Sequence, residues 1–118
     1  MGYNLFTMNK IILLEPFSKW LRKLKDPIAK ARIISRLEQA ERGNFGDSKA
    51  ISSNIHNFFE MRISVSAGYR LYYFCDGINI YVVAYGGSKS SQQKDIIRAE
   101  KIISTYKLQE QEENDKKN

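Results

Sequence analysis

Apolar residues follow a helical spacing in two stretches of the N-terminal half. The first stretch repeats at i, i+3, i+4 and i+7, which is one face of a helix, and its members are Phe17, Trp20, Leu21 and Leu24. Asp26 is a favourable N-cap and Pro27 suits the first helical position, so a second helix is predicted to begin there. Its apolar stripe is Ile33, Leu37 and Ala40, flanked by Ile34, and Gly43 is placed to end it.

The period changes to two in the second half of the chain. Phe59, Met61, Ile63 and Val65 alternate with polar residues, which is typical of a half-buried strand. A turn at 66–68, a strand at 69–75, an Asp76-Gly77 hairpin and a strand at 78–85 follow. Gly86-Gly87 is expected to break the sheet, and Ser90 or Ser91 to cap a last helix with the buried stripe Ile96, Ala99, Ile103 and Tyr106.

With a further short strand at 10–15 and a polar loop at 44–54, the predicted fold is a compact α+β domain. It has a mainly antiparallel sheet, with two N-terminal helices and a C-terminal helix packed on it. The helices are expected on one face of the sheet, which leaves the other face open. The 118 residues divide into a flexible leader (1–8), a single domain (9–108) and a disordered acidic tail (109–118).

The charge is uneven along the chain. Nineteen Lys and Arg stand against 13 Asp and Glu, a net charge of +6. The tail holds four acidic and two basic residues, so residues 1–108 carry 17 basic and 9 acidic ones, a net charge of +8. A small basic body favours an anionic partner, either nucleic acid or an acidic protein.

The amino-acid composition also excludes several classes of functional site. With one cysteine (Cys75) and one histidine (His56), the chain has no intrachain disulfide, no Cys/His zinc site and no Ser-His-Asp or Cys-His arrangement. We therefore expect no metal, no small-molecule cofactor and a cytoplasmic location. No apolar run reaches the roughly 20 residues of a membrane span, and no secretory signal is present.

The candidate chemistry lies in the strands and at the last helix. Arg70 is predicted within about one residue of being opposite Arg62, a repulsive arrangement unless Glu60 or a visiting anion compensates it. Lys89 lies in a small-residue junction before the last helix, where backbone N–H groups and the helix dipole favour anions. RNA cleavage suits such residues, because the 2′-hydroxyl supplies the nucleophile and the protein supplies proton transfer and charge stabilisation.

Several segments together resemble a toxin of the RelE/ParE superfamily, and within it the phage-derived, HigB-like branch known as addiction module killer proteins. The resemblance spans roughly residues 11 to 106. It rests on 17–26, 31–33, 36–37, 43–49, 60–63, 68–72 and 86–96.

The resemblance implies a RelE-like fold and metal-independent mRNA cleavage on the ribosome. It also implies neutralisation by a cognate antitoxin, usually a helix-turn-helix protein in this branch. Arg62, Arg70 and Lys89 are then the expected catalytic residues. The expected contacts to ribosomal RNA are Lys49, Gln92, Lys94, Arg22 and Lys23.

Departures from the family pattern keep alternatives open. Ribosome-dependent members of the family place lysines where this strand carries Phe58 and Glu60. They place a tyrosine near the position of Asp95 in the last helix. Members of the family also often have Asp at the position of Ser88. The alternatives are a ParE-like inhibitor that binds DNA gyrase without cutting RNA, and a decayed toxin that retains only antitoxin binding.

Overall fold

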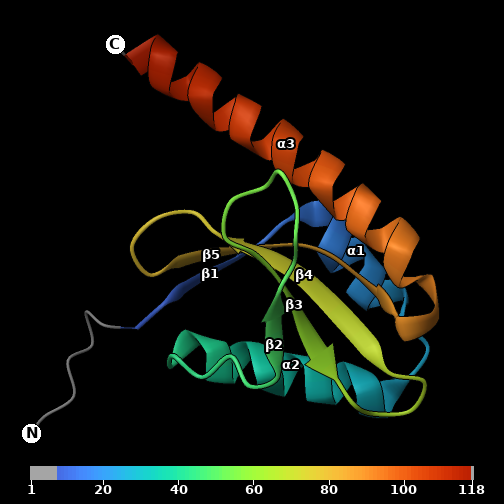
Figure 1. Ribbon diagram of the computed structural model, residues 1–118. Helices are drawn as coiled ribbons and strands as arrows, with labels where there is room; N and C mark the ends of the chain where they lie inside the picture. The colour runs from blue at the N-terminus through green and yellow to red at the C-terminus, as the bar shows by residue number, and fades with distance from the viewer. Residues whose placement is uncertain (1–7, 118) are drawn as a thin grey trace, which may run out of the picture.

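A computed structural model describes residues 8–117 (Figure 1), so the predicted leader lies, apart from Met8, outside the described residues. Its helices are α1 (Glu15–Lys23), α2 (Pro27–Glu41) and α3 (Gln92–Lys117), with a short 3₁₀ turn η2 (Lys89–Ser91) before α3. Its strands are β1 (Lys10–Leu13), β2 (Ser48–Ala50), β3 (Phe58–Ile63), β4 (Tyr69–Cys75) and β5 (Ile80–Ser88).

The five strands form one sheet in the order β1-β5-β4-β3-β2. The pairs β2·β3, β3·β4 and β4·β5 are antiparallel, whereas β1 lies parallel to β5. The parallel pair requires a crossover, which α1, α2 and the meander provide. The predicted class, an α+β domain with a mainly antiparallel sheet, is confirmed.

Local sequence signals define the two N-terminal helices as predicted. Asp26 is the N-cap of α2: its side chain accepts a hydrogen bond from Ala29 N at 3.0 Å, and Pro27 occupies the first helical position. The Asp26 carboxylate also accepts a hydrogen bond from the Tyr69 hydroxyl at 3.0 Å, so the cap ties α2 to the start of β4.

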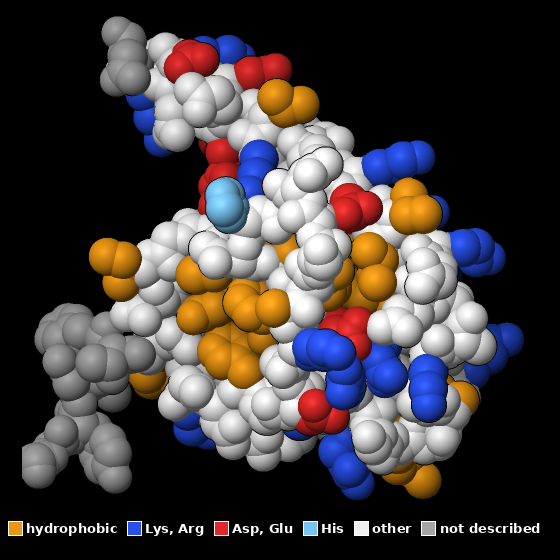
Figure 2. Space-filling model, in the orientation of Figure 1, with side chains coloured by type: hydrophobic (Ala, Val, Ile, Leu, Met, Phe, Trp, Pro, Cys, Tyr) orange, Lys and Arg blue, Asp and Glu red, His pale blue; other side chains and the backbone are white. Residues whose placement is uncertain are grey.

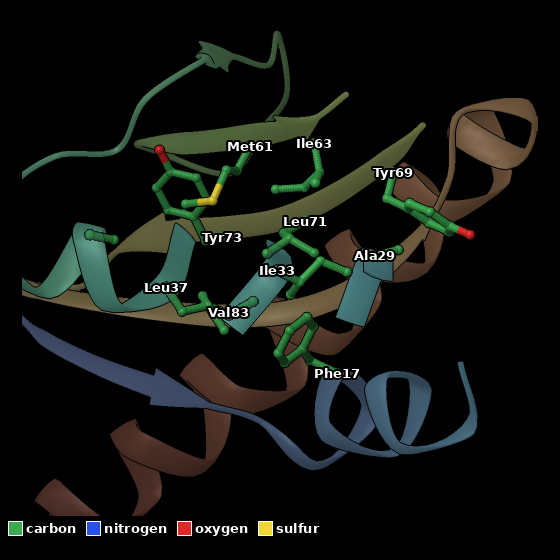
Figure 3. Packing of buried hydrophobic residues seen from close by; sticks show 11 residues of the cluster. Phe17, Ala29, Ile33, Leu37, Met61, Ile63, Tyr69, Leu71, Tyr73 and Val83 are labelled. Carbon is green, nitrogen blue, oxygen red and sulfur yellow. The ribbon is translucent and has the colours of Figure 1, made fainter. Parts of the chain in front are cut away.

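Two apolar clusters lie on opposite faces of the sheet. The first joins Phe17 of α1 and the α2 stripe to Met61, Ile63, Leu71 and Val83 (Figure 3). The second joins Ala99 and Ile103 of α3 to Phe58, Tyr72, Phe74, Val82 and Ala84. Because α3 covers the face opposite α2, the expectation of an open sheet face is wrong: the apolar stripe of α3 needs an apolar surface, and Phe58 and Phe74 provide one.

The sheet is also longer than the sequence suggested at two places. The loop predicted at 44–54 contains the short edge strand β2, and β5 continues through Gly86-Gly87 to Ser88 instead of ending before it. A β-bulge precedes the two glycines: Tyr72 pairs with Tyr85 and Tyr73 with Val83, which leaves Ala84 as an extra residue.

The tail differs from the disordered segment predicted at 109–118. Residues 109–117 continue α3, which projects beyond the rest of the fold (Figure 1). The physical reason is that α3 is already nucleated where it packs on the sheet, and extension with Gln, Glu and Lys then costs little. Residues 111–117 are fully exposed, so this end is a solvated helix.

Candidate functional site

Arg62 and Arg70 are directly opposite each other across the β3–β4 ladder, as the sequence predicted. Strand alternation places both on the sheet face that carries Phe58 and Phe74, but at the far end of the strands. The Arg62 side chain is about one third exposed, at 32%, whereas that of Arg70 is 13% exposed. Two guanidinium groups therefore lie next to each other at the end of this sheet face that is partly open to solvent.

Glu60 compensates this pair from within the same face. Its Oε2 atom lies 3.1 Å from Arg62 Nε and 3.5 Å from Arg70 Nε. The residue is only 4% exposed. Its other oxygen, Oε1, accepts a hydrogen bond from Gln92 Nε2 at 2.7 Å. The carboxylate thus links β3, β4 and the first residue of α3.

Lys89 shares a hollow of about 490 Å³ with both arginines. The 64–68 turn between β3 and β4 and the side chain of Asp47 form the rest of its wall. Lys89 N donates to Gly68 O at 2.9 Å, which fixes the start of η2 against that turn. The three expected catalytic residues therefore line one hollow.

A second hollow, of about 510 Å³, adjoins the first and shares Arg62 and Arg70 with it. Lys49 of β2, Gln92 and Ile96 of α3, and Glu60 line it. We call the two hollows together the arginine cleft. Figure 2 shows Lys and Arg side chains gathered around acidic ones on this face, beside an apolar patch. The cleft is thus suited to an extended polyanion.

The junction before α3 depends on close backbone approach. A Cβ atom added at Gly87 would lie 1.8 Å from Asp95 Oδ2, so only glycine fits beneath the first turn of α3. Asp95 is buried, and its Oδ2 atom accepts a hydrogen bond from the Ser91 hydroxyl at 2.5 Å. Asp95 therefore fixes the start of the helix and does not line the arginine cleft.

Arg36 of α2 supports the opposite wall of the cleft. Its guanidinium donates to Arg62 O at 2.6 Å and to Phe45 O at 3.0 Å. Burial is the main reason that the pKa of Arg36 is lowered, while the charge of Asp47 opposes that shift. The clamp fastens the loop at 45–47, which leads into β2 and Lys49, to the end of β3. Sequence reasoning missed Arg36, whose only signal is a charged residue beside an apolar stripe.

Tyr72 lies between the charged and apolar ends of this face. It is completely buried, and its hydroxyl has no hydrogen-bond partner within residues 8–117. Burial, followed by the charges of Asp95 and Glu60, raises the pKa of Tyr72 well above its ordinary value. The folded protein accordingly keeps this hydroxyl protonated, on the strand position directly opposite Glu60.

The remaining expected contact residues lie elsewhere. Arg22 pairs with Glu15 at 2.6 Å on the exposed surface of α1, and Lys23 is exposed at the end of that helix. Lys94 is exposed in the first turn of α3. None of the three lines the arginine cleft as the described residues form it.

Two kinds of feature are absent from residues 8–117. No group of three or more His, Cys, Asp or Glu side chains is placed to hold a metal ion. Among the described helices, none has both the length and the apolar character needed to cross a membrane.

Comparison with solved structures defines the class to which this fold belongs. The structure is similar to the RelBE2 toxin–antitoxin complex of Mycobacterium tuberculosis, with a TM-score of 0.57 and 18% identity over 70% of this chain and 99% of the other. It is also similar to a mutant of E. coli toxin RelE in the free state, with a TM-score of 0.57 and 17% identity over 77% of this chain and 97% of the other. The fold is that of the RelE toxins.

Sequence comparison narrows the class to a family. An uncharacterized protein of Haemophilus influenzae is 42% identical over 83 residues, which cover 70% of this chain and 81% of that protein. The family model described as phage derived protein Gp49-like (DUF891) matches residues 19–107. The chain belongs to this Gp49-like, phage-derived family, and the RelE-like fold that the sequence resemblance implies is confirmed.

Proposed function

We propose that the protein is a toxin of a type II toxin–antitoxin system that cleaves mRNA on the ribosome without a metal. The observation that carries this proposal is the arginine cleft, in which Arg62, Arg70 and Lys89 line one hollow. Cleavage through the 2′-hydroxyl passes through a phosphorane with additional negative charge, and fixed cations stabilise that charge. The RelE-like fold and the Gp49-like family support the same class of protein.

Each cleft residue receives a role from its position. Arg70, the more buried arginine, stabilises the charge that develops on the phosphorane. Arg62 positions the scissile phosphate from the opposite strand. Lys89 holds a neighbouring phosphate or assists the leaving oxygen from the far wall. Lys49 and Gln92 extend the cleft along the RNA backbone.

Residues outside the cleft contribute to the encounter with the ribosome. Arg22, Lys23 and Lys94 are exposed and contact ribosomal RNA in this proposal. Such contacts raise affinity without reading sequence. A cognate antitoxin, of helix-turn-helix type, neutralises the protein in the cytoplasm. The similarity to a toxin that was solved with its antitoxin supports such a partner.

The test is primer extension on mRNA from a purified translation system, with and without ribosomes. We expect wild-type protein to cut at codon positions only when ribosomes are present. We expect Arg70→Ala to reduce the rate by about 10²–10³-fold, the usual cost of removing one donor to a developing oxyanion. Lys10→Ala, exposed on the edge strand β1, is the control and should cut normally.

Two outcomes would contradict the proposal. If Arg62→Ala and Arg70→Ala both cut at the wild-type rate, the assigned roles are wrong. If wild-type protein makes no cuts, then a ParE-like gyrase inhibitor or a decayed toxin is the better description. Stalled replication on expression distinguishes the gyrase inhibitor, whereas unaffected growth with tight antitoxin binding distinguishes the decayed toxin.

A further inference from the structure

Glu60 contacts the two arginines at a particular atom, and this detail matters for the cleft. Like charges directly opposite each other across a ladder are destabilising, so Arg62 and Arg70 need a compensating anion. Glu60 provides it unequally: Oε2 accepts a hydrogen bond from Arg62 Nε at 3.1 Å, and it lies 3.5 Å from Arg70 Nε as an ion pair without a hydrogen bond. A guanidinium group is a planar fork, so holding Nε fixes the direction in which its two Nη atoms point.

The other contacts of the arginines leave part of each fork available. Arg62 Nη1 lies 3.9 Å from Asp47 Oδ1, and Arg70 Nη1 donates to Tyr69 O at 3.3 Å. Within residues 8–117, neither Nη2 atom donates a hydrogen bond. Both arginines line both hollows of the cleft, so an anion can reach these free edges.

Glu60 is itself held in place. Gln92 donates to its second oxygen at 2.7 Å, and the residue is 4% exposed. Displacing the carboxylate from the arginines would leave a buried charge without its ionic partners, which is strongly unfavourable. An incoming phosphate is therefore expected to join this arrangement at the Nη edges and not to replace Glu60.

We propose that Glu60 is a positioning residue, which holds Arg62 by a hydrogen bond at Nε and Arg70 by charge attraction, so that their Nη edges lie side by side toward the phosphate. The inference rests on the proposed function for its catalytic consequence. The positioning itself is a property of the free protein.

Nuclear magnetic resonance of the free protein tests the positioning directly. The Hε proton of Arg62 is expected to exchange slowly with water in wild type and rapidly in Glu60→Ala. Titration with inorganic phosphate should shift the resonances of both guanidinium groups while the Hε proton of Arg62 stays protected. Glu38→Gln, an exposed carboxylate on α2, is the control and should leave all of these signals unchanged.

Single-turnover cleavage at saturating ribosome tests the catalytic consequence. Glu60→Ala should lower the rate constant by about 10²-fold, because misdirected groups lose most of their effect on the transition state. Glu60→Gln keeps an oxygen that can accept one Nε–H, so its rate should fall between wild type and Glu60→Ala. Both variants should bind ribosomes as wild type does, which separates positioning from binding.

Three results would overturn the inference. Rapid Hε exchange in wild type would show that Glu60 does not hold the arginines. Loss of Hε protection on phosphate addition would show that phosphate displaces Glu60. Cleavage by Glu60→Gln at or above the wild-type rate would show that the carboxylate is not needed. If wild type cuts no RNA, the proposed function fails, but the resonance experiment still decides the positioning.

Discussion

The two ends of one sheet face behave differently, although the same two strands form both. At one end Phe58 and Phe74 are directly opposite each other, and α3 covers them. At the other end Arg62 and Arg70 are directly opposite each other and line a cleft. Glu60 and Tyr72 form the pair between them. A change from core to candidate site thus takes only four residues along a strand.

The difference teaches how a small domain holds a charged site rigidly. The apolar end anchors the strands and α3, so the charged end does not need to contribute stability. Glu60 of β3 contacts the arginines, and Gln92 of α3 holds Glu60 in turn. Both residues belong to elements that the apolar end anchors. Changes at the apolar end should therefore affect folding, and changes at the charged end should affect chemistry.

Phe58→Ala should have the largest effect on stability. Phe58 is 1% exposed, and removing a buried phenyl ring costs about 3–5 kcal/mol. Urea denaturation measures the change. Arg62→Ala is the matched comparison on the same strand and should cost less, because Arg70 and Gln92 still contact the Glu60 carboxylate after the change. Equal losses for the two variants would contradict the division between the two ends.

Gly87→Ala should come next, because its Cβ atom would collide with the Asp95 carboxylate. Overpacking of this kind costs about 1–3 kcal/mol. The start of α3 must shift, and Gln92 with it, so phosphate should also bind more weakly. Asp95→Ala removes the colliding group. In a double-mutant cycle, the cost of Gly87→Ala should shrink in the Asp95→Ala background, and additive losses would contradict the explanation.

Tyr72→Phe should have a smaller effect, of the opposite sign. The hydroxyl is buried without a partner, so its removal should stabilise the protein by about 1 kcal/mol. The raised pKa of Tyr72 means that the folded state resists losing this proton. Stability should therefore fall as the pH rises above about 10, the ordinary tyrosine value, and less so in Tyr72→Phe. Alkaline denaturation curves that coincide would contradict this.

Arg22→Ala should have the smallest effect. The Arg22–Glu15 pair is mostly exposed, at 62% and 72% for the two side chains, so its loss should cost about 0.5 kcal/mol or less. If Arg22 contacts a ribosomal phosphate, the slope of log affinity against log salt should fall by about one. The cleavage rate at saturating ribosome should stay unchanged. A large loss of that rate would place Arg22 nearer the chemistry than the structure does.

The elements that sequence predicted best are those with strong local signals. The Asp26-Pro27 helix start and the opposition of Arg62 and Arg70 both follow from nearby residues, and the structure confirms them. The sheet face that α3 covers could not be predicted from the sequence. The strands carry apolar residues on both faces, and the apolar stripe of α3 fits either one. β2 is short and polar, and only its pairing with β3 reveals it.

Parts of the candidate site needed the structure for a similar reason. Gln92 and Glu60 are 32 residues apart, so their hydrogen bond depends on where α3 begins over the sheet. The Arg36 clamp depends on loop carbonyls that no spacing rule locates. Lys89 and Lys49 carried signals of charge and position, but which of the cations share one cleft depends on the fold.

The extra residue at Ala84 determines which sheet face each later side chain of β5 occupies. Strand side chains alternate between faces, and the bulge advances that alternation by one step. As a result, Gly86 lies beneath Trp20 on one face and Gly87 beneath Asp95 on the other, each where a side chain would not fit. Deleting Ala84 would remove the bulge: Tyr85 would follow Val83 directly and still pair with Tyr72, so every later strand residue would keep its face. A one-residue gap at this place would thus be tolerated by the pairing of β5, whereas a two-residue gap would turn its later side chains to the opposite faces.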